Sequence, residues 1–233
     1  MIEVSTRGGK LGLDPMSMRL YVSSPQWGRM SSSIANRSDK RELITEAAIA
    51  VFAAKGYRSA RVSDVAKEAG VADGTIYLYF RNKEDLLLSI FEEKMDMLLQ
   101  ILESKMEGVT CPLDKIRIYA HQHIEQLQTH PLIAQVFQVE LRQSHKFLND
   151  YRPQKLGDYL NVFGDAVKEA KKQGLIRDDV DPYVAKWAFF GSLDELCIRW
   201  VLSRNRERFD LDKAATQVVD TFFCGVTTAN NQE

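Results

Sequence analysis

Residues Val62–Leu87 read VSDVAKEAGVADGTIYLYFRNKEDLL, and the rest of the chain is organised around this stretch. Ser63 carries a hydroxyl suited to capping a helix, and Asp64 would lie in the first turn, where the helix dipole favours a carboxylate. Apolar residues at one-turn spacing then predict a short helix from Asp64 to Ala69. Gly70 ends that helix because it accepts the left-handed backbone that a helix terminus often needs. The first half of the stretch therefore predicts a short helix followed by a turn.

The next segment, Gly74–Phe80, is too short to be stable as an isolated helix and is rich in aromatic residues. Tyr77 and Phe80 are three positions apart and share a helix face, whereas Tyr79 points elsewhere, so at least one ring should face outward. A helix–turn–helix supplies the support that such a segment needs. Its first helix braces the second, whose N-terminal residues enter a DNA major groove about 12 Å wide. The stretch therefore predicts a DNA-binding element.

Several residues of this element are suited to contacting DNA. Gly74 permits close approach of the backbone, and the Thr75 hydroxyl and the Tyr77 ring can reach phosphates or base edges. Asn82 caps the following helix, and Lys83 then places a cation at a helix start, where it opposes the dipole. A phosphate lying opposite would explain that cation. We therefore predict that Lys83 contacts the DNA backbone.

Residues 70–87, GVADGTIYLYFRNKEDLL, and the upstream residues 52–57, FAAKGY, resemble the DNA-binding domain of the TetR family of bacterial transcriptional repressors. The resemblance implies a reading helix with Thr75, Tyr77 and Tyr79, a phosphate contact from Lys83, and a ligand-sensing, dimerising helical domain in the rest of the chain. Asp73 departs from what a DNA surface favours; it is either a turn-former or an acceptor for a cytosine amino group. The residues that we predict to contact DNA are Ser63, Gly74, Thr75, Tyr77, Tyr79 and Lys83.

Composition limits the class of protein. The net charge is −1, and residues 36–85 contain nine Lys or Arg against eight Asp or Glu, so DNA affinity must come from a few placed cations. Three cysteines without close spacing fit a reducing compartment rather than a disulfide framework. We find neither an apolar run of about eighteen residues nor the apolar core of a signal peptide. We therefore expect a cytoplasmic protein without a membrane partner.

The pattern along the chain predicts an all-α fold. Residues 1–35 show no helical or strand period and read as a flexible extension; the alternative is an arm that reaches along DNA with its arginines and lysine. A helix over residues 38–55 would support the helix–turn–helix of residues 62–80, here called the reader. A long helix from Lys83 would be a lever between the two domains. Further helices are expected over residues 113–129, 131–144, 146–173, 183–203 and 211–227. We assign residues 1–35 to a flexible N-terminal extension, 36–85 to a helix–turn–helix DNA-binding domain, and 86–233 to a helical ligand-binding and dimerisation domain.

The last two of these helices are too apolar to be lone surface helices, so they need a partner surface. In the TetR family the corresponding helices form a two-fold dimer. Two readers related by such symmetry would meet major grooves about 34–36 Å apart, which predicts a homodimer on a palindromic, double-stranded operator.

Charged residues interrupt two apolar helices of the expected sensing domain. Arg142 follows an apolar run, and Asp194 and Glu195 stand within another. Charges in such settings are costly unless they are paired. Either Arg142 forms an ion pair with Asp194 or Glu195, or one or more of these groups lines an effector pocket.

Two short motifs, VELRQS at 139–144 and GSLDE at 191–195, resemble the acyl-CoA-responsive, fatty-acid-degradation branch of the family. The resemblance implies a small-molecule effector, a long-chain acyl-CoA, that releases the repressor from fatty acid degradation genes. Aromatic and aliphatic side chains would meet the acyl tail, and cations would meet the CoA phosphates. The alternative effector is another hydrophobic small molecule acting at an efflux or catabolic gene. The predicted ligand-binding residues are Phe137, Leu141, Arg142, Lys146, Tyr151, Trp187, Phe190 and Asp194.

An enzyme is the competing class, and the sequence argues against it. The four histidines lack the spacing of metal ligands on one helix face. Neither a phosphate-binding glycine loop nor a nucleophile elbow is present. We therefore expect no catalytic residues, no metal and no cofactor.

Overall fold

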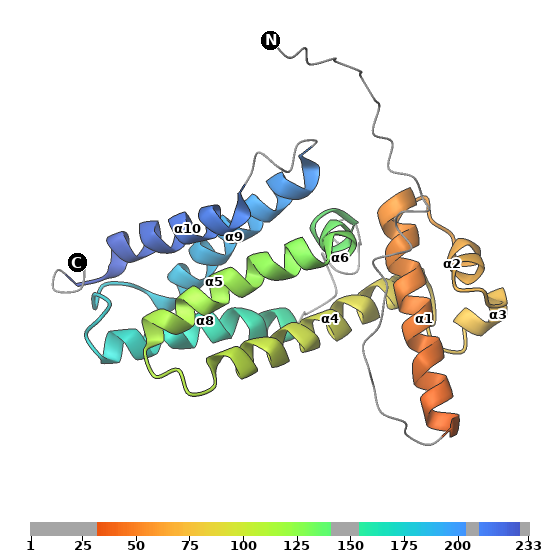
Figure 1. Cartoon of the computed structure of the whole chain (residues 1–233), viewed down its shortest axis with the longest axis horizontal. Helices are drawn as coiled ribbons and strands as arrows, with labels where there is room; N and C mark the ends of the chain where they lie inside the picture. Colours follow the sequence, from red (N-terminus) through yellow and green to blue (C-terminus); the bar gives the residue numbers. More distant parts are fainter. Residues whose placement is uncertain (1–31, 141–153, 204–209, 229–233) are drawn as a thin grey trace, which may run out of the picture. The chain divides into compact units, whose positions relative to one another are not determined.

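The structure, a computed structural model, describes residues 32–140, 154–203 and 210–228, and these residues are almost entirely helical (Figure 1). Within these ranges, the β-structure is one antiparallel bridge between Ile176 and Thr227. The all-α prediction is confirmed. The elements are α1 (Ser32–Lys55), α2 (Val62–Glu68), α3 (Asp73–Ile76), α4 (Lys83–Met106), α5 (Pro112–Thr129), α6 (Pro131–Gln135), the π-helix η2 (Val136–Glu140), α8 (Gln154–Lys172), α9 (Pro182–Leu202) and α10 (Leu211–Val226).

Proline and glycine set many of the helix limits, as the sequence predicted. Pro112, Pro131 and Pro182 occupy the first turns of α5, α6 and α9, where a missing N–H costs nothing. Gly56 and Gly174, with φ of 77° and 69°, follow the ends of α1 and α8 in the left-handed region. The expected helix over residues 131–144 differs from the structure, because α6 is followed by η2 instead of continuing as an α-helix.

The local prediction for the first short helix was wrong in one detail. The residue before α2 is Arg61, whose amide donates to Asp64 Oδ2 at 3.0 Å, so Ser63 lies inside the first turn and is not the cap. Lys55 Nζ also donates to Asp64 Oδ1, at 2.7 Å. The Asp64 carboxylate therefore satisfies the amide of Arg61 at the helix start, and the side chain of the residue before α2 makes no cap hydrogen bond.

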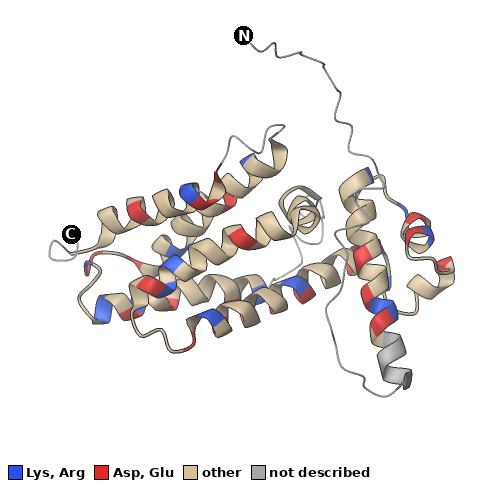
Figure 2. Ribbon diagram, viewed as in Figure 1, with Lys and Arg blue, Asp and Glu red and all other residues tan. Residues whose placement is uncertain are grey.

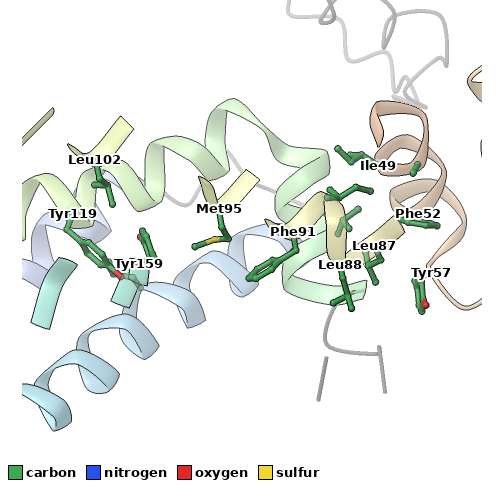
Figure 3. Packing of buried hydrophobic residues seen from close by; sticks show 14 of the residues in the cluster. Ile49, Phe52, Tyr57, Leu87, Leu88, Phe91, Met95, Leu102, Tyr119 and Tyr159 are labelled. Atoms are coloured by element: carbon green, nitrogen blue, oxygen red, sulfur yellow. The ribbon is translucent and has the colours of Figure 1, made fainter. Parts of the chain in front are cut away.

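The helix α4 links the DNA-binding helices to the C-terminal helices. It packs against α5 and α8. Its buried residues also belong to the apolar cluster that contains the buried residues of α1 and α2. Figure 3 follows this cluster from Phe52, through Leu87, Phe91 and Met95 of α4, to Tyr119 of α5. The expected lever is therefore packed along its length rather than free in solvent.

Candidate DNA-binding and effector sites

The reading segment is held by two buried residues and presents two exposed ones. Ile76 and Phe80 are both 1% exposed and anchor the segment to the core, whereas Tyr77 is 57% exposed and Leu78 is 73% exposed. The prediction that at least one ring faces outward is confirmed. The prediction that Tyr77 and Phe80 share a face was wrong, because α3 ends at Ile76 and residues 77–79 form a turn.

The other residues predicted to contact DNA lie on α2, on α3, on the turn after α3 and at the start of α4. Ser63 and Gly74 are exposed, and Thr75 and Tyr79 are half-buried. The turn between α2 and α3 passes through Gly70, with φ of 65°, and the Val71 amide donates to the Ala66 carbonyl at 2.9 Å. The sequence analysis did not include Leu78 among the residues that face DNA. Its position midway between the buried Ile76 and Phe80 could have signalled a side chain that points away from the core.

The start of α4 has the capping that the sequence predicted. The Asp85 amide donates to Asn82 Oδ1 at 2.8 Å, and the Asp85 carboxylate accepts from the Arg81 amide at 2.9 Å. This reciprocal pair fixes the first turn of α4 and thus the direction in which the chain leaves the reading segment.

Lys83 is held inside the protein surface. Its ammonium donates to the carbonyl oxygens of Tyr57, Ala60 and Arg58, at 2.6, 2.9 and 3.3 Å, and lies 4.5 Å from the centre of the Tyr57 ring. Burial lowers the pKa of Lys83. Burial, with a smaller effect from Glu84, raises the pKa of Tyr57 to about 12. The structure therefore gives this cation acceptors within the chain, and a phosphate contact remains a prediction.

Charges of both signs are mixed on the DNA-binding helices. Figure 2 shows acidic and basic residues side by side on α1 and α2 rather than a wholly basic face. Two of these charges pair with α4: Glu46 with Lys94 at 2.9 Å, and Arg41 with Glu93. This mixture of charges is consistent with DNA binding by a few individually positioned cations rather than by a wholly basic surface.

The predicted ligand-binding residues that the structure describes lie on two elements. Trp187, Phe190 and Asp194 follow one another at spacings of three and four residues along α9, so they share one side of that helix. Phe137 of η2 packs edge-on against Phe91 of α4, with ring centres 5.2 Å apart. Leu141, Arg142, Lys146 and Tyr151 lie outside the described residues.

A cluster of polar groups inside the bundle, which sequence reasoning missed, adjoins this side of α9. His123 Nδ1 and the Tyr159 hydroxyl share a hydrogen bond of 2.7 Å, and the His123 ring meets the Phe190 ring edge-on at 5.7 Å. Burial lowers the pKa of His123 to about 4, and Asp194 opposes that shift. Tyr119 stacks on Tyr159 at 4.6 Å. Tyr119 and His123 lie one turn apart on α5, whereas Tyr159 comes from α8, 36 residues beyond His123, so no local pattern could have found the whole cluster.

Two polar atoms of α5 are buried without a hydrogen-bond partner in the described part of the chain: the Tyr119 hydroxyl and Gln122 Oε1. Such atoms are rare in folded proteins, because an unmade hydrogen bond in the interior is costly. A bound ligand with polar atoms would satisfy them.

The charged groups of α9 have partners of their own. Asp194 accepts from Gln138 Nε2 of η2 at 2.8 Å, and Glu195 pairs with Arg199 one turn later at 2.7 Å. The expected alternative of an ion pair from Arg142 falls outside the described residues. Asp194 therefore faces the neighbouring η2, whereas Glu195 is engaged along its own helix.

The outer side of α9 and α10 carries an apolar groove of about 440 Å³. Its lining combines small side chains with larger apolar ones, listed here in chain order: Ala188, Phe189, Ser192, Leu196, Ala214, Gln217, Val218, Thr221 and Phe222. Tyr183 and Trp187 of α9 are also exposed, at 65% and 45%. The sequence predicted a partner surface on these two helices without choosing a face. Val218 and Phe222 line this groove, whereas Leu193, Val219 and Phe223 are buried in the core.

Among the described residues, no helix has the length and apolarity needed to cross a bilayer. The same residues contain no group of three or more histidine, cysteine, aspartate or glutamate side chains placed to hold a metal ion.

Both halves of the chain match known protein families. Residues 44–90 match the model for bacterial regulatory proteins of the tetR family, and residues 91–225 match the model for the C-terminal region of YsiA-like proteins. The fatty acid metabolism regulator protein of Bacillus subtilis (strain 168) is 36% identical over 183 residues, which cover 78% of this chain and 93% of that protein.

Two solved structures are similar over most of their length. The fatty acid degradation regulator FadR from Bacillus halodurans is 36% identical, with a TM-score of 0.74, covering 84% of this chain and 98% of that one. FadR from Bacillus subtilis in complex with stearoyl-CoA is also 36% identical, with a TM-score of 0.74, covering 79% and 98%. These relatives are regulators rather than enzymes. With both of its halves matched and its reading segment exposed, the chain belongs to the TetR family of bacterial transcriptional regulators.

Proposed function

We propose that this regulator represses fatty acid degradation genes, that it binds a palindromic operator as a homodimer, and that a long-chain acyl-CoA releases it. It would act in the cytoplasm, where the chromosome lies. Residues 36–85 would bind DNA, and residues 86–233 would bind the effector and the second protomer. Ser63, Gly74, Thr75, Tyr77 and Tyr79 would face the DNA.

The exposed Tyr77 supports the DNA part of this proposal. A tyrosine side chain that is more than half exposed, on a segment anchored by two buried neighbours, can enter a groove without unfolding its support. Ser63, Gly74 and Thr75 lie on the same two short helices and offer hydroxyls and bare backbone to the duplex.

Two buried polar atoms of α5, the Tyr119 hydroxyl, which also interacts with Tyr159, and Gln122 Oε1, support the effector part of the proposal. The Tyr119 hydroxyl can donate and Gln122 Oε1 can accept, so the site fits a ligand with amide groups on an apolar chain. The pantetheine arm and acyl tail of an acyl-CoA have that chemistry. The solved relative that holds stearoyl-CoA, at 36% identity, supports the same class of ligand.

The segment from α6 to η2 supports a route by which the ligand would act. Gln138 donates to Asp194 of α9, Phe137 packs against Phe91 of α4, and Gln135 Nε2 donates to the Ala53 carbonyl of α1 at 2.8 Å. A ligand that favours another arrangement of this segment would shift the reader through α4 and α1. A coupling free energy of about 1–3 kcal/mol is typical of such release.

A titration tests the effector. An operator is first selected from random DNA, and its binding is then measured as palmitoyl-CoA or stearoyl-CoA is added, with free CoA and free palmitate as controls. Release by the thioesters alone is expected, and the variant Tyr119→Phe should need more thioester for the same release. If thioesters cause no release while the operator is still bound specifically, the acyl-CoA part of the proposal fails and the repressor part stands.

A further inference from the structure

The ammonium of Lys83 connects the start of α4 to the turn that joins α1 and α2. All three carbonyl groups that it meets belong to that turn: Tyr57, Arg58 and Ala60. The Tyr57 ring covers the ammonium on another side, and Tyr57 itself packs edge-on against Phe52 of α1 at 5.5 Å. One side chain therefore joins the two segments that flank the reading element in sequence.

The geometry suits an ammonium group and no other common cation. An ammonium has three N–H donors that diverge from one nitrogen, and the three carbonyl oxygens lie 2.6–3.3 Å from that nitrogen. A guanidinium presents its donors in a flat fork, which cannot meet three acceptors gathered around one point. Because these contacts occupy all three donors, a DNA phosphate would have to displace one of them.

We propose that Lys83 is a positioning residue for DNA binding: it holds the α1–α2 turn on the start of α4 and so sets the orientation of α2 and the reading segment relative to the lever. This explanation accounts for the cation at a helix start without a phosphate opposite it. The proposal rests on the DNA-binding function of the family and not on the identity of the effector.

Two substitutions separate this role from a direct phosphate contact. Lys83→Met keeps a long unbranched side chain, one atom shorter, and removes its donors, and Lys83→Arg keeps the charge but changes the donor geometry. If Lys83 positions the turn, both variants should bind the selected operator about tenfold more weakly, the scale expected for loss of hydrogen bonds to a charged group. The dependence of binding on salt concentration should stay as in the wild type, because no phosphate contact is lost.

The measurements are made well below the melting temperature of each variant, so that a change in stability alone leaves the affinity of the folded protein unaltered. Lys105→Met is the matched control, since Lys105 lies on the same helix and pairs with Glu125 at 2.5 Å, far along the chain from the turn. A salt slope that falls by about one in Lys83→Met, with normal binding by Lys83→Arg, would show a phosphate contact and overturn the proposal. Unchanged operator affinity in both variants would overturn it as well.

Discussion

Tyr77 and Phe80 are aromatic residues three positions apart, yet the fold gives them opposite tasks. Phe80 is buried and receives the Arg41 guanidinium over its ring at 4.6 Å, whereas Tyr77 projects into solvent. Sequence could identify the segment as a reader, because turn, aromatic segment and following cap stand in a recognisable order. It could not assign each ring, because the chain leaves helical geometry after Ile76.

The first prediction concerns these two rings. Tyr77→Ala should change the free energy of unfolding by no more than about 0.5 kcal/mol, as exposed substitutions do. It should weaken binding to the operator more than binding to random DNA, measured by fluorescence anisotropy. Phe80→Ala should instead destabilise the fold by about 3–5 kcal/mol, because it leaves a cavity in the core. Equal losses of Tyr77→Ala on operator and random DNA would mean that Tyr77 does not read sequence.

The second prediction concerns His123 and pH. Its pKa is about 4 in the folded protein and about 6.5 in the unfolded chain, so between these values only the unfolded chain binds the proton. The free energy of unfolding should therefore fall as pH drops from 6.5 towards 4, by about 2 kcal/mol at pH 5 from this group. Urea unfolding at a series of pH values measures the effect.

His123→Gln should remove this part of the pH dependence, and His121→Gln, at an exposed position on the same helix, should keep it. Parallel pH curves for the wild type and His123→Gln would contradict the assignment. The half-buried position of His123 against Tyr159 could not be found from the sequence, since Tyr159 is 36 residues away.

At the scale of the elements, helix limits followed from the sequence where proline, glycine or a cap decided them. The limits of α5, α9 and α10 differ from those expected by one residue at most. The π-helix η2 did not follow, because no residue in Val136–Glu140 signals the wider turn. In η2, Phe137 contacts Phe91 of α4 and Gln138 contacts Asp194 of α9. Such contacts between distant segments leave no pattern in the local sequence.

The third prediction concerns the backbone of α3. Gly74 is an exposed helical residue, and a Cβ atom added there would meet nothing within 4 Å. Gly74→Ala should therefore stabilise the free protein by about 0.5–1 kcal/mol, because alanine loses less conformational freedom in a helix. If the bare backbone lies close to DNA, the same change should weaken operator binding.

The control for this prediction is Gly157→Ala on α8, which also has open space around the added atom. It should raise the melting temperature without changing operator affinity. Should Gly74→Ala bind the operator as tightly as the wild type, close approach of the backbone at this position would be excluded.

At the scale of the molecule, one apolar core in the described part of the chain includes both Tyr119, near the proposed effector site, and Phe52, behind the reading segment. Figure 3 shows this core passing along α4, so a change of packing near Tyr119 has a physical connection to Phe52 behind the reader. The all-α fold was predictable from helix periodicity, and the family was predictable from the resemblance of the reading motif. The polar cluster of the bundle required the fold itself, because Tyr159 of α8 joins Tyr119 and His123 of α5 across the bundle.

The fourth prediction concerns assembly. Val218 lines the apolar groove between α9 and α10, together with the small residues Ala188 and Ala214, and we predict that a second protomer packs there. Val218→Arg would bury an unpaired charge in that interface, which is costly. We expect the variant to sediment as a monomer at concentrations where the wild type is a dimer.

Loss of the dimer should also weaken operator binding by about a hundredfold or more, because the second reader no longer benefits from the binding of the first. Met97→Arg on α4, at a side chain that is 52% exposed, is the control for adding a positive charge and should remain dimeric. Because a cation on the surface attracts DNA, this control also separates the effect of charge from that of assembly. A dimeric Val218→Arg protein with normal operator binding would show that another surface joins the protomers, and a monomeric wild type would remove the two-fold symmetry from which the palindromic operator was predicted.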